Sequence, residues 1–66
     1  MSKYLNPKER AEKMFDALYW EYIYPLGPKN AYVEAKIECE EVAHLRGIAS
    51  GKQVYWGKVK KEIYFL

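Results

Sequence analysis

The sequence predicts an all-α fold, a small three-helix domain with helices over roughly residues 7–23, 29–46 and 52–64. Three observations predict it. Apolar residues recur in each segment at the three- and four-residue spacing of one helical face. Proline and glycine stand between the segments, where helices begin and end. The chain has 66 residues, which is enough for one domain at most.

The first predicted helix begins at a clear N-terminal signal. Asn6 is expected as the N-cap, Pro7 at the first helical position, and Glu9 as the partner in a capping box. The helix should end near Ile23, because Pro25 disfavours helical geometry at the residue before it. Its core face is formed by residues at helical spacing: Ala11, Met14, Phe15, Leu18 and Tyr22.

The second predicted helix follows the break at residues 25–28, with Gly27 or Asn30 at its cap, and it should stop at Gly47. Its main stripe consists mostly of small side chains, which let another helix approach closely: Ala31, Ala35, Cys39 and Val42. Val33 and Ile37 point the other way. A helix with apolar residues on two faces is usually packed between neighbours, and a second copy of the chain is one candidate.

The third predicted helix begins after Ser50, where residues 50–53 have capping-box spacing. Its apolar face contains Tyr55, Val59, Ile63 and Leu66, with Trp56 beside them. The competing prediction is a β-hairpin of residues 53–56 and 62–65, because the segment is rich in valine, isoleucine and aromatic residues. Gly57 also weakens the helix, by roughly 1 kcal/mol relative to alanine.

A chain this short buries only about 60% of the surface that its unfolded form exposes, so it often needs a staple or a partner. Cys39 is the only cysteine, which excludes a disulfide within the chain. Cys39 and His44 are the only soft ligands, whereas a structural zinc needs four. We therefore expect no metal and no cofactor, and a homo-oligomer as the remaining source of stability.

The formal net charge of +2 is too small to require nucleic acid as a partner. Residues 31–50 carry two basic and four acidic groups, whereas residues 51–66 carry four basic and one acidic. An acidic middle and a basic end can meet head to tail, within or between chains. Residues 1–5 read as a short leader without a signal peptide's apolar stretch, and no run reaches the ~20 apolar residues of a membrane span. With one unpaired cysteine, the chain is expected in the cytoplasm.

The candidate binding residues form two groups. Trp20 and Tyr24 lie four apart, on the face opposite the first helix's core stripe, where they could stack on a base or anchor a partner. The second group, the basic end, combines positive charge that could bind a phosphate with aromatic rings that could stack on a base. It consists of Arg46, Lys52, Tyr55, Trp56, Lys58, Lys60 and Lys61. The alternatives are aromatic rings packed inside the fold and an ordinary solvated lysine face.

No arrangement of residues predicts an enzyme. Cys39 and His44 are five apart, on different faces of one helix, so they cannot form a catalytic dyad within it. Glu34, Glu38 and Glu41 share a face, but paired carboxylates also need a cleft to hold a substrate, and a three-helix chain of this size offers little cleft. Solvation, or pairing with lysines of another subunit, is the expected role of these carboxylates.

Residues 35–43 and 55–63 resemble a family of very small bacteriophage accessory proteins of unassigned function. That family shows an Ala-Lys-x-x-Cys stretch on one helix and a Tyr-Trp-x-x-Val-Lys-x-Glu-Ile stretch on the next. The match covers about half of the chain. The chain departs from the pattern at Glu40 and Glu41, where apolar residues are usual, and at Gly57, where a polar helix former is usual.

The resemblance implies a small viral protein in the cytoplasm of an infected bacterium. It would counter a host defence by sequestering a nucleotide signal in a helical oligomer or by blocking a host protein. The alternative is a small DNA-binding transcriptional regulator with the third helix in a groove, although aromatic residues stand where base-reading side chains usually lie. A structural component of a virion is a third possibility.

Overall fold

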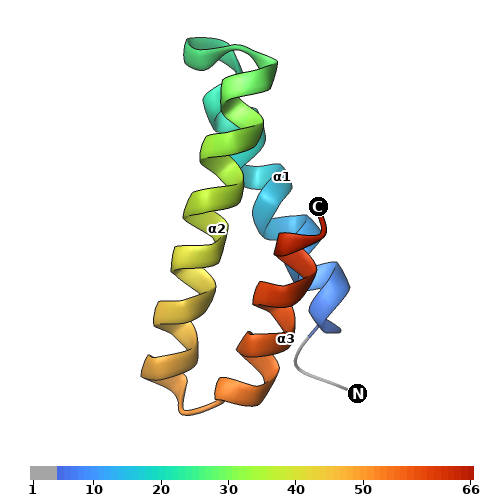
Figure 1. Cartoon of the computed structure of the whole chain (residues 1–66), viewed down its shortest axis with the longest axis vertical. Coiled ribbons are helices and arrows are strands. Elements are labelled where there is room, and N and C mark those ends of the chain that lie inside the picture. Colours follow the sequence, from blue (N-terminus) through green and yellow to red (C-terminus); the bar gives the residue numbers. More distant parts are fainter. Residues whose placement is uncertain (1–4) are drawn as a thin grey trace.

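The structure is a computed structural model of the whole chain, and it describes residues 5–66. Three helices follow one another: α1 (Pro7–Leu26), α2 (Pro28–Ser50) and α3 (Gln53–Tyr64). They pack as a compact bundle in which every pair of helices is in contact (Figure 1). The predicted all-α three-helix domain is confirmed, and the β-hairpin alternative for the last segment is excluded. Within the described part of the chain, no helix is both long and apolar enough to cross a membrane.

Helix α1 begins as predicted and ends later than predicted. The Asn6 side chain accepts a hydrogen bond from the backbone N–H of Glu9 at 2.9 Å, and Pro7 occupies the first helical position. The expected end near Ile23 is wrong, because the helix continues through Pro25 to Leu26. Pro25 lies in the last turn, where its missing N–H removes one helical hydrogen bond, and Gly27 closes the helix by donating to the Ile23 carbonyl.

Helix α2 is longer than predicted at its C-terminal end. Gly27, with a φ of 82°, caps its start, and Pro28 takes the first helical position. The predicted stop at Gly47 is wrong, because Gly47 is a buried residue in the helix interior. The helix instead ends at Gly51, which takes the left-handed conformation with a φ of 72°. A glycine can end a helix in this way, but tertiary packing decides which glycine does so.

Helix α3 begins one residue later than predicted, and without the predicted serine cap. Ser50 belongs to α2, and Lys52 takes the N-cap position of α3 without a side-chain hydrogen bond to the helix. Ser50 still serves the turn, because its hydroxyl oxygen accepts from the Lys52 backbone N–H at 3.2 Å. The capping box expected at residues 50–53 is therefore wrong.

The core contains most of the residues that the helical spacing predicts, together with three others, whereas Tyr22 and Val42 are half-buried outside it. The buried set is Ala11, Ala31, Ala35, Cys39, Ala43, Gly47, Trp56, Val59 and Ile63. Met14, Phe15, Leu18, Tyr55 and Leu66 pack against this core as half-buried side chains. The small residues of α2 allow a close approach, since a Cβ added to Gly47 would lie 3.1 Å from the Cβ of Trp56.

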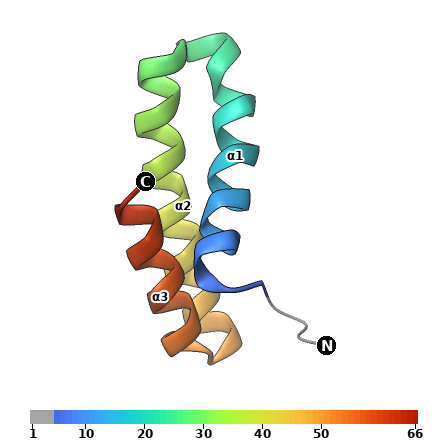
Figure 2. The same cartoon turned by 90° about the vertical axis from the view of Figure 1, so that its right-hand side faces the viewer.

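Helix α3 covers only part of the hairpin that α1 and α2 form. It has 12 residues against 20 and 23, and the C-terminus lies about halfway along α2 (Figure 2). The rest of the hairpin extends beyond α3, and we call residues 15–35 the arm. The Cα radius of gyration of 12.1 Å, against about 11 Å expected for a compact chain of this length, reflects this extension.

Candidate functional site

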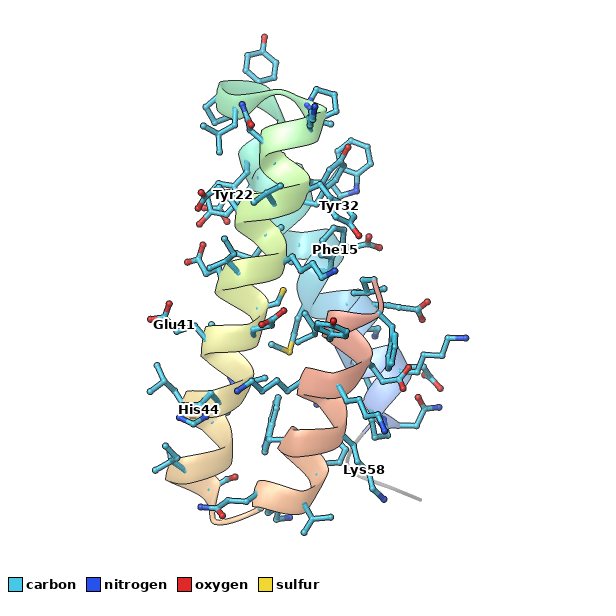
Figure 3. All side chains as sticks on the ribbon, viewed as in Figure 1. Phe15, Tyr22, Tyr32, Glu41, His44 and Lys58 are labelled. Atoms are coloured by element: carbon cyan, nitrogen blue, oxygen red, sulfur yellow. The ribbon has the colours of Figure 1, made fainter. Side chains whose placement is uncertain are left out.

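Four aromatic rings form a continuous row along one side of the arm. Phe15 stacks on Tyr19 with ring centroids 5.7 Å apart, and it meets Tyr32 edge-on at 5.3 Å. Trp20 contacts Tyr19 edge-on at 5.7 Å. Phe15 and Tyr32 lie together just beyond the C-terminal end of α3 (Figure 3). We call these four residues the arm surface.

The end of α3 is anchored beside the arm surface by α2. The Tyr32 hydroxyl donates a hydrogen bond to the carbonyl oxygen of Leu66. The Lys36 ammonium lies over two rings, 5.8 Å from the Tyr32 centroid and 5.6 Å from the Tyr64 centroid. These contacts hold the last residues of the chain against α2. The arm surface therefore begins where α3 ends.

The two aromatic residues predicted to point away from the core are both exposed. Trp20 is 68% exposed and Tyr24 is 97% exposed. Trp20 leans against Tyr19 and so belongs to the arm surface, whereas Tyr24 lies close to the turn between α1 and α2. The exposure of both side chains agrees with their predicted position away from the core.

Trp56 and Arg46, both predicted binding residues, contact each other in the fold, with Trp56 buried and Arg46 exposed. Trp56 is only 6% exposed and belongs to the core. The guanidinium groups of Arg46 and Arg10 lie over its ring at 5.7 and 5.8 Å from the centroid. The Arg10 Nε is buried without a hydrogen-bond partner, so the indole ring is the main contact of that group. Trp56 therefore does not offer a ring to a ligand in this structure.

Three other residues of the predicted basic end lie together at the start of α3, whereas Lys60 lies beside Glu41 and His44. Lys52, Tyr55 and Lys58 line a shallow groove of about 660 Å³, with Pro7 and Val54 on its walls. The Tyr55 hydroxyl donates to the Leu5 carbonyl at 2.5 Å, which fixes the position of that ring. The groove thus combines two ammonium groups with apolar walls, and it is open to solvent.

Cys39 and His44 do not meet. Cys39 is fully buried, and desolvation, together with the nearby charges of Glu38 and Glu40, raises the pKa of its thiol to about 11. A thiol with a raised pKa is a poor nucleophile at neutral pH. His44 lies on the exposed side of α2 (Figure 3). The described residues contain no group of three or more side chains that could hold a metal ion.

The predicted acidic stripe is divided between two roles. Glu38 accepts a hydrogen bond from the Tyr22 hydroxyl, which ties α2 to α1. Glu34 and Glu41 are exposed. Glu41 and His44 share a shallow depression with Lys60, so part of the basic end does lie beside the acidic face of the same molecule.

The sequence patterns did not indicate Tyr32 and Lys36 as site residues. Tyr32 was not singled out by any pattern as a site residue, and Lys36 was noted only as part of the Ala-Lys-x-x-Cys stretch. Their importance depends on where α3 ends, since the Leu66 carbonyl and the Tyr64 ring supply their contacts. The four-residue spacing of Tyr32 and Lys36, which places both on one face of α2, was the only sign of their contact in the sequence.

Comparisons with known proteins add no relative to this description. No protein-family model, no curated protein and no solved structure matches the chain.

Proposed function

We propose that the chain is a small binding protein without catalytic activity, whose arm surface takes an amphipathic helix of a partner protein. One observation carries the proposal: α3 stops halfway along the α1–α2 hairpin, and four aromatic side chains lie on the arm that it leaves uncovered. The proposal corresponds to the expectation that a viral accessory protein blocks a host protein.

The bundle itself provides the template for the partner. Helix α3 packs Trp56, Val59 and Ile63 against α1 and α2, which shows what kind of helix this hairpin accepts. A partner helix beyond the C-terminus would present its own apolar residues at three- and four-residue spacing. Aromatic rings are enriched in such contacts because they bury large areas at a small cost in conformational entropy.

Photo-crosslinking in bacterial cells identifies the partner. A photoreactive phenylalanine analogue is placed at Tyr19 in the arm surface, and in a matched control at Tyr24. We expect one protein to be captured from position 19 and not from position 24. The captured protein is then purified for binding measurements.

Binding of that protein to two single variants tests the arm surface. Trp20→Ala should weaken binding by about 30-fold, because truncating an anchoring aromatic residue costs about 2 kcal/mol. Tyr24→Ala should leave the affinity unchanged, since Tyr24 is almost fully exposed. Circular dichroism should show the same helix content in both variants. Equal losses in both, or a loss in neither, would refute the arm surface as the binding site.

A nucleotide is the second candidate, and the groove at the start of α3 favours it. Lys52 and Lys58 place positive charge beside apolar walls there, as phosphate and base recognition require. The burial of Trp56 removes one of the two rings expected to stack on the base. Calorimetric titration with ATP, compared between the unmodified chain and Lys58→Glu, tests this candidate. Binding that is unaffected by Lys58→Glu would exclude the groove.

A further inference from the structure

The outward side of α2 carries a row of exposed side chains, apolar at both ends and polar in the middle. We call this row the outer α2 face, and it consists of Val33, Ile37, Glu41, His44 and Ile48. Their spacing places them on one side of the helix, opposite the buried Ala35 and Cys39. Ile37 is 55% exposed and Ile48 is 58% exposed. Glu41 and His44 are exposed as well, and the Lys60 side chain of α3 borders the shallow depression that they line with Ile37.

The outward side of α3 has the same pattern with the opposite charge. We call it the outer α3 face, and it consists of Val54, Gly57, Lys58, Lys61 and Phe65. Val54 is 76% exposed and Phe65 is 69% exposed. Lys58 and Lys61 are exposed between them, and Gly57 has nothing within 4 Å of an added Cβ, so the middle of this face is smooth.

The two faces match in length as well as in charge. Ile37 and Ile48 are eleven residues apart, and so are Val54 and Phe65, which on helices corresponds to about 16 Å in both cases. If the two helices are aligned antiparallel, each apolar end of one face meets an apolar end of the other. Lys61 then lies opposite Glu41. An α2–α2 contact in the same antiparallel alignment would place Glu41 opposite His44 and give it no lysine partner, and an α3–α3 contact would oppose Lys58 to Lys61.

From these observations we infer that the chain associates with itself head to tail, with the outer α3 face of one copy on the outer α2 face of the next. Glu41 and Lys58 lie on opposite sides of the molecule (Figure 3). One copy can therefore bind two neighbours at once, and such a heterologous contact builds a ring or an open chain rather than an isolated two-fold dimer. One helix on one helix is a small interface, so the association is weak and depends on concentration.

Two variants, each defective in one face, test this arrangement. Ile37→Asp places a charge in the outer α2 face, and Val54→Asp does so in the outer α3 face. Both positions are largely exposed, so neither change affects the core. Sedimentation velocity over about 10 µM to about 1 mM, a range that covers weak association, is the measurement. The unmodified chain should form species larger than a dimer, whereas each variant alone should remain monomeric.

Mixing the two variants is the decisive step. Each variant retains one intact face, so an equimolar mixture should form one-to-one dimers that do not grow further. This result would also show that both variants are folded. A mixture that stays monomeric, an unmodified chain that is monomeric throughout, or a variant that assembles like the unmodified chain would overturn the inference.

Two controls separate this inference from the arm surface. Trp20→Ala should assemble like the unmodified chain, because Trp20 belongs to neither outer face. Raising the salt concentration to about 1 M shortens the screening length to about 3 Å and should weaken the assembly. Loss of assembly in Trp20→Ala would assign self-association to the arm surface and overturn the head-to-tail arrangement.

Discussion

Gly47 and Gly57 are both helical glycines, but their surroundings differ. A Cβ at Gly47 would lie 3.1 Å from the Cβ of Trp56, whereas a Cβ at Gly57 would have nothing within 4 Å. The atom facing Gly47 is joined directly to the backbone of α3, so it cannot move aside without moving that helix. Gly47 therefore sets how closely α2 and α3 approach, and Gly57 has no such role in the bundle.

Alanine at the two glycines should change stability in opposite directions. Gly57→Ala should raise the free energy of unfolding by about 1 kcal/mol through helix propensity alone. Gly47→Ala raises helix propensity by the same amount, but the added methyl group pushes α2 away from Trp56. We therefore expect its free energy of unfolding to be lower than that of the unmodified chain. Urea denaturation of both variants measures the difference. If Gly47→Ala proves as stable as Gly57→Ala, the close approach does not limit the packing.

The buried thiol of Cys39 makes stability depend on pH in the alkaline range. The pKa is about 11 in the fold, against 9.0 for the ordinary thiol. Because the folded pKa is raised, the stability that the neutral thiol contributes is complete below about pH 9 and is lost as the pH rises through the folded pKa. The unfolded chain releases its proton first, which favours unfolding.

Comparison with Cys39→Ala isolates this contribution from the titration of lysines and tyrosines. The unmodified chain should be more stable than the variant at about pH 8, and the difference should shrink at about pH 10.5. Urea midpoints of both proteins at the two pH values give the measurement. A difference that is independent of pH would mean that the thiol is not held away from water in the fold.

At the scale of the elements, the spacing of apolar residues predicted the three helices and most of the core. It succeeded because the same contacts that bury a residue also create the pattern along the chain. The helix ends were harder to predict. Gly47 and Gly51 both have the residue type of a C-terminal cap, and only the packing of Trp56 against Gly47 decides that the second one is used.

Helix α1 continues through Pro25, although proline disfavours helical geometry at the residue before it. Pro25 lies inside α1, where it lacks the N–H of a helical hydrogen bond. Pro25→Ala should therefore raise the free energy of unfolding by about 1 to 2 kcal/mol, which is less than the full cost of an interior proline because the site is in the last turn. Thermal denaturation followed by circular dichroism measures the change.

Pro28→Ala is the matched control for that prediction. Pro28 occupies the first position of α2, where proline is favoured and no backbone N–H is missing from the helix. Its replacement should give no gain, and a loss of up to about 1 kcal/mol through the greater freedom of the unfolded chain. Equal gains in both variants would indicate an effect outside the α1 helix.

At the scale of the whole molecule, the candidate site could be predicted only in part. Trp20 was indicated because its position on the helix faces away from the core stripe, and its exposure agrees with that position. Trp56 was expected beside the basic end as an available ring, but it is buried in the core, with the Arg10 and Arg46 guanidinium groups over its ring. Periodicity along one helix does not show which side chains another helix will cover.

Because the helices differ in length, we expect the two ends of the hairpin to differ in local stability. Near the turn at Gly27 the hairpin is held by contacts between α1 and α2 alone, whereas around Cys39 and Ala43 all three helices contribute to the core. Local opening should therefore begin at the tip of the arm and leave the three-helix part intact. We therefore expect the arm to change conformation more readily than the three-helix part. An arm that can adjust its conformation can bind surfaces that a fully rigid bundle would not fit.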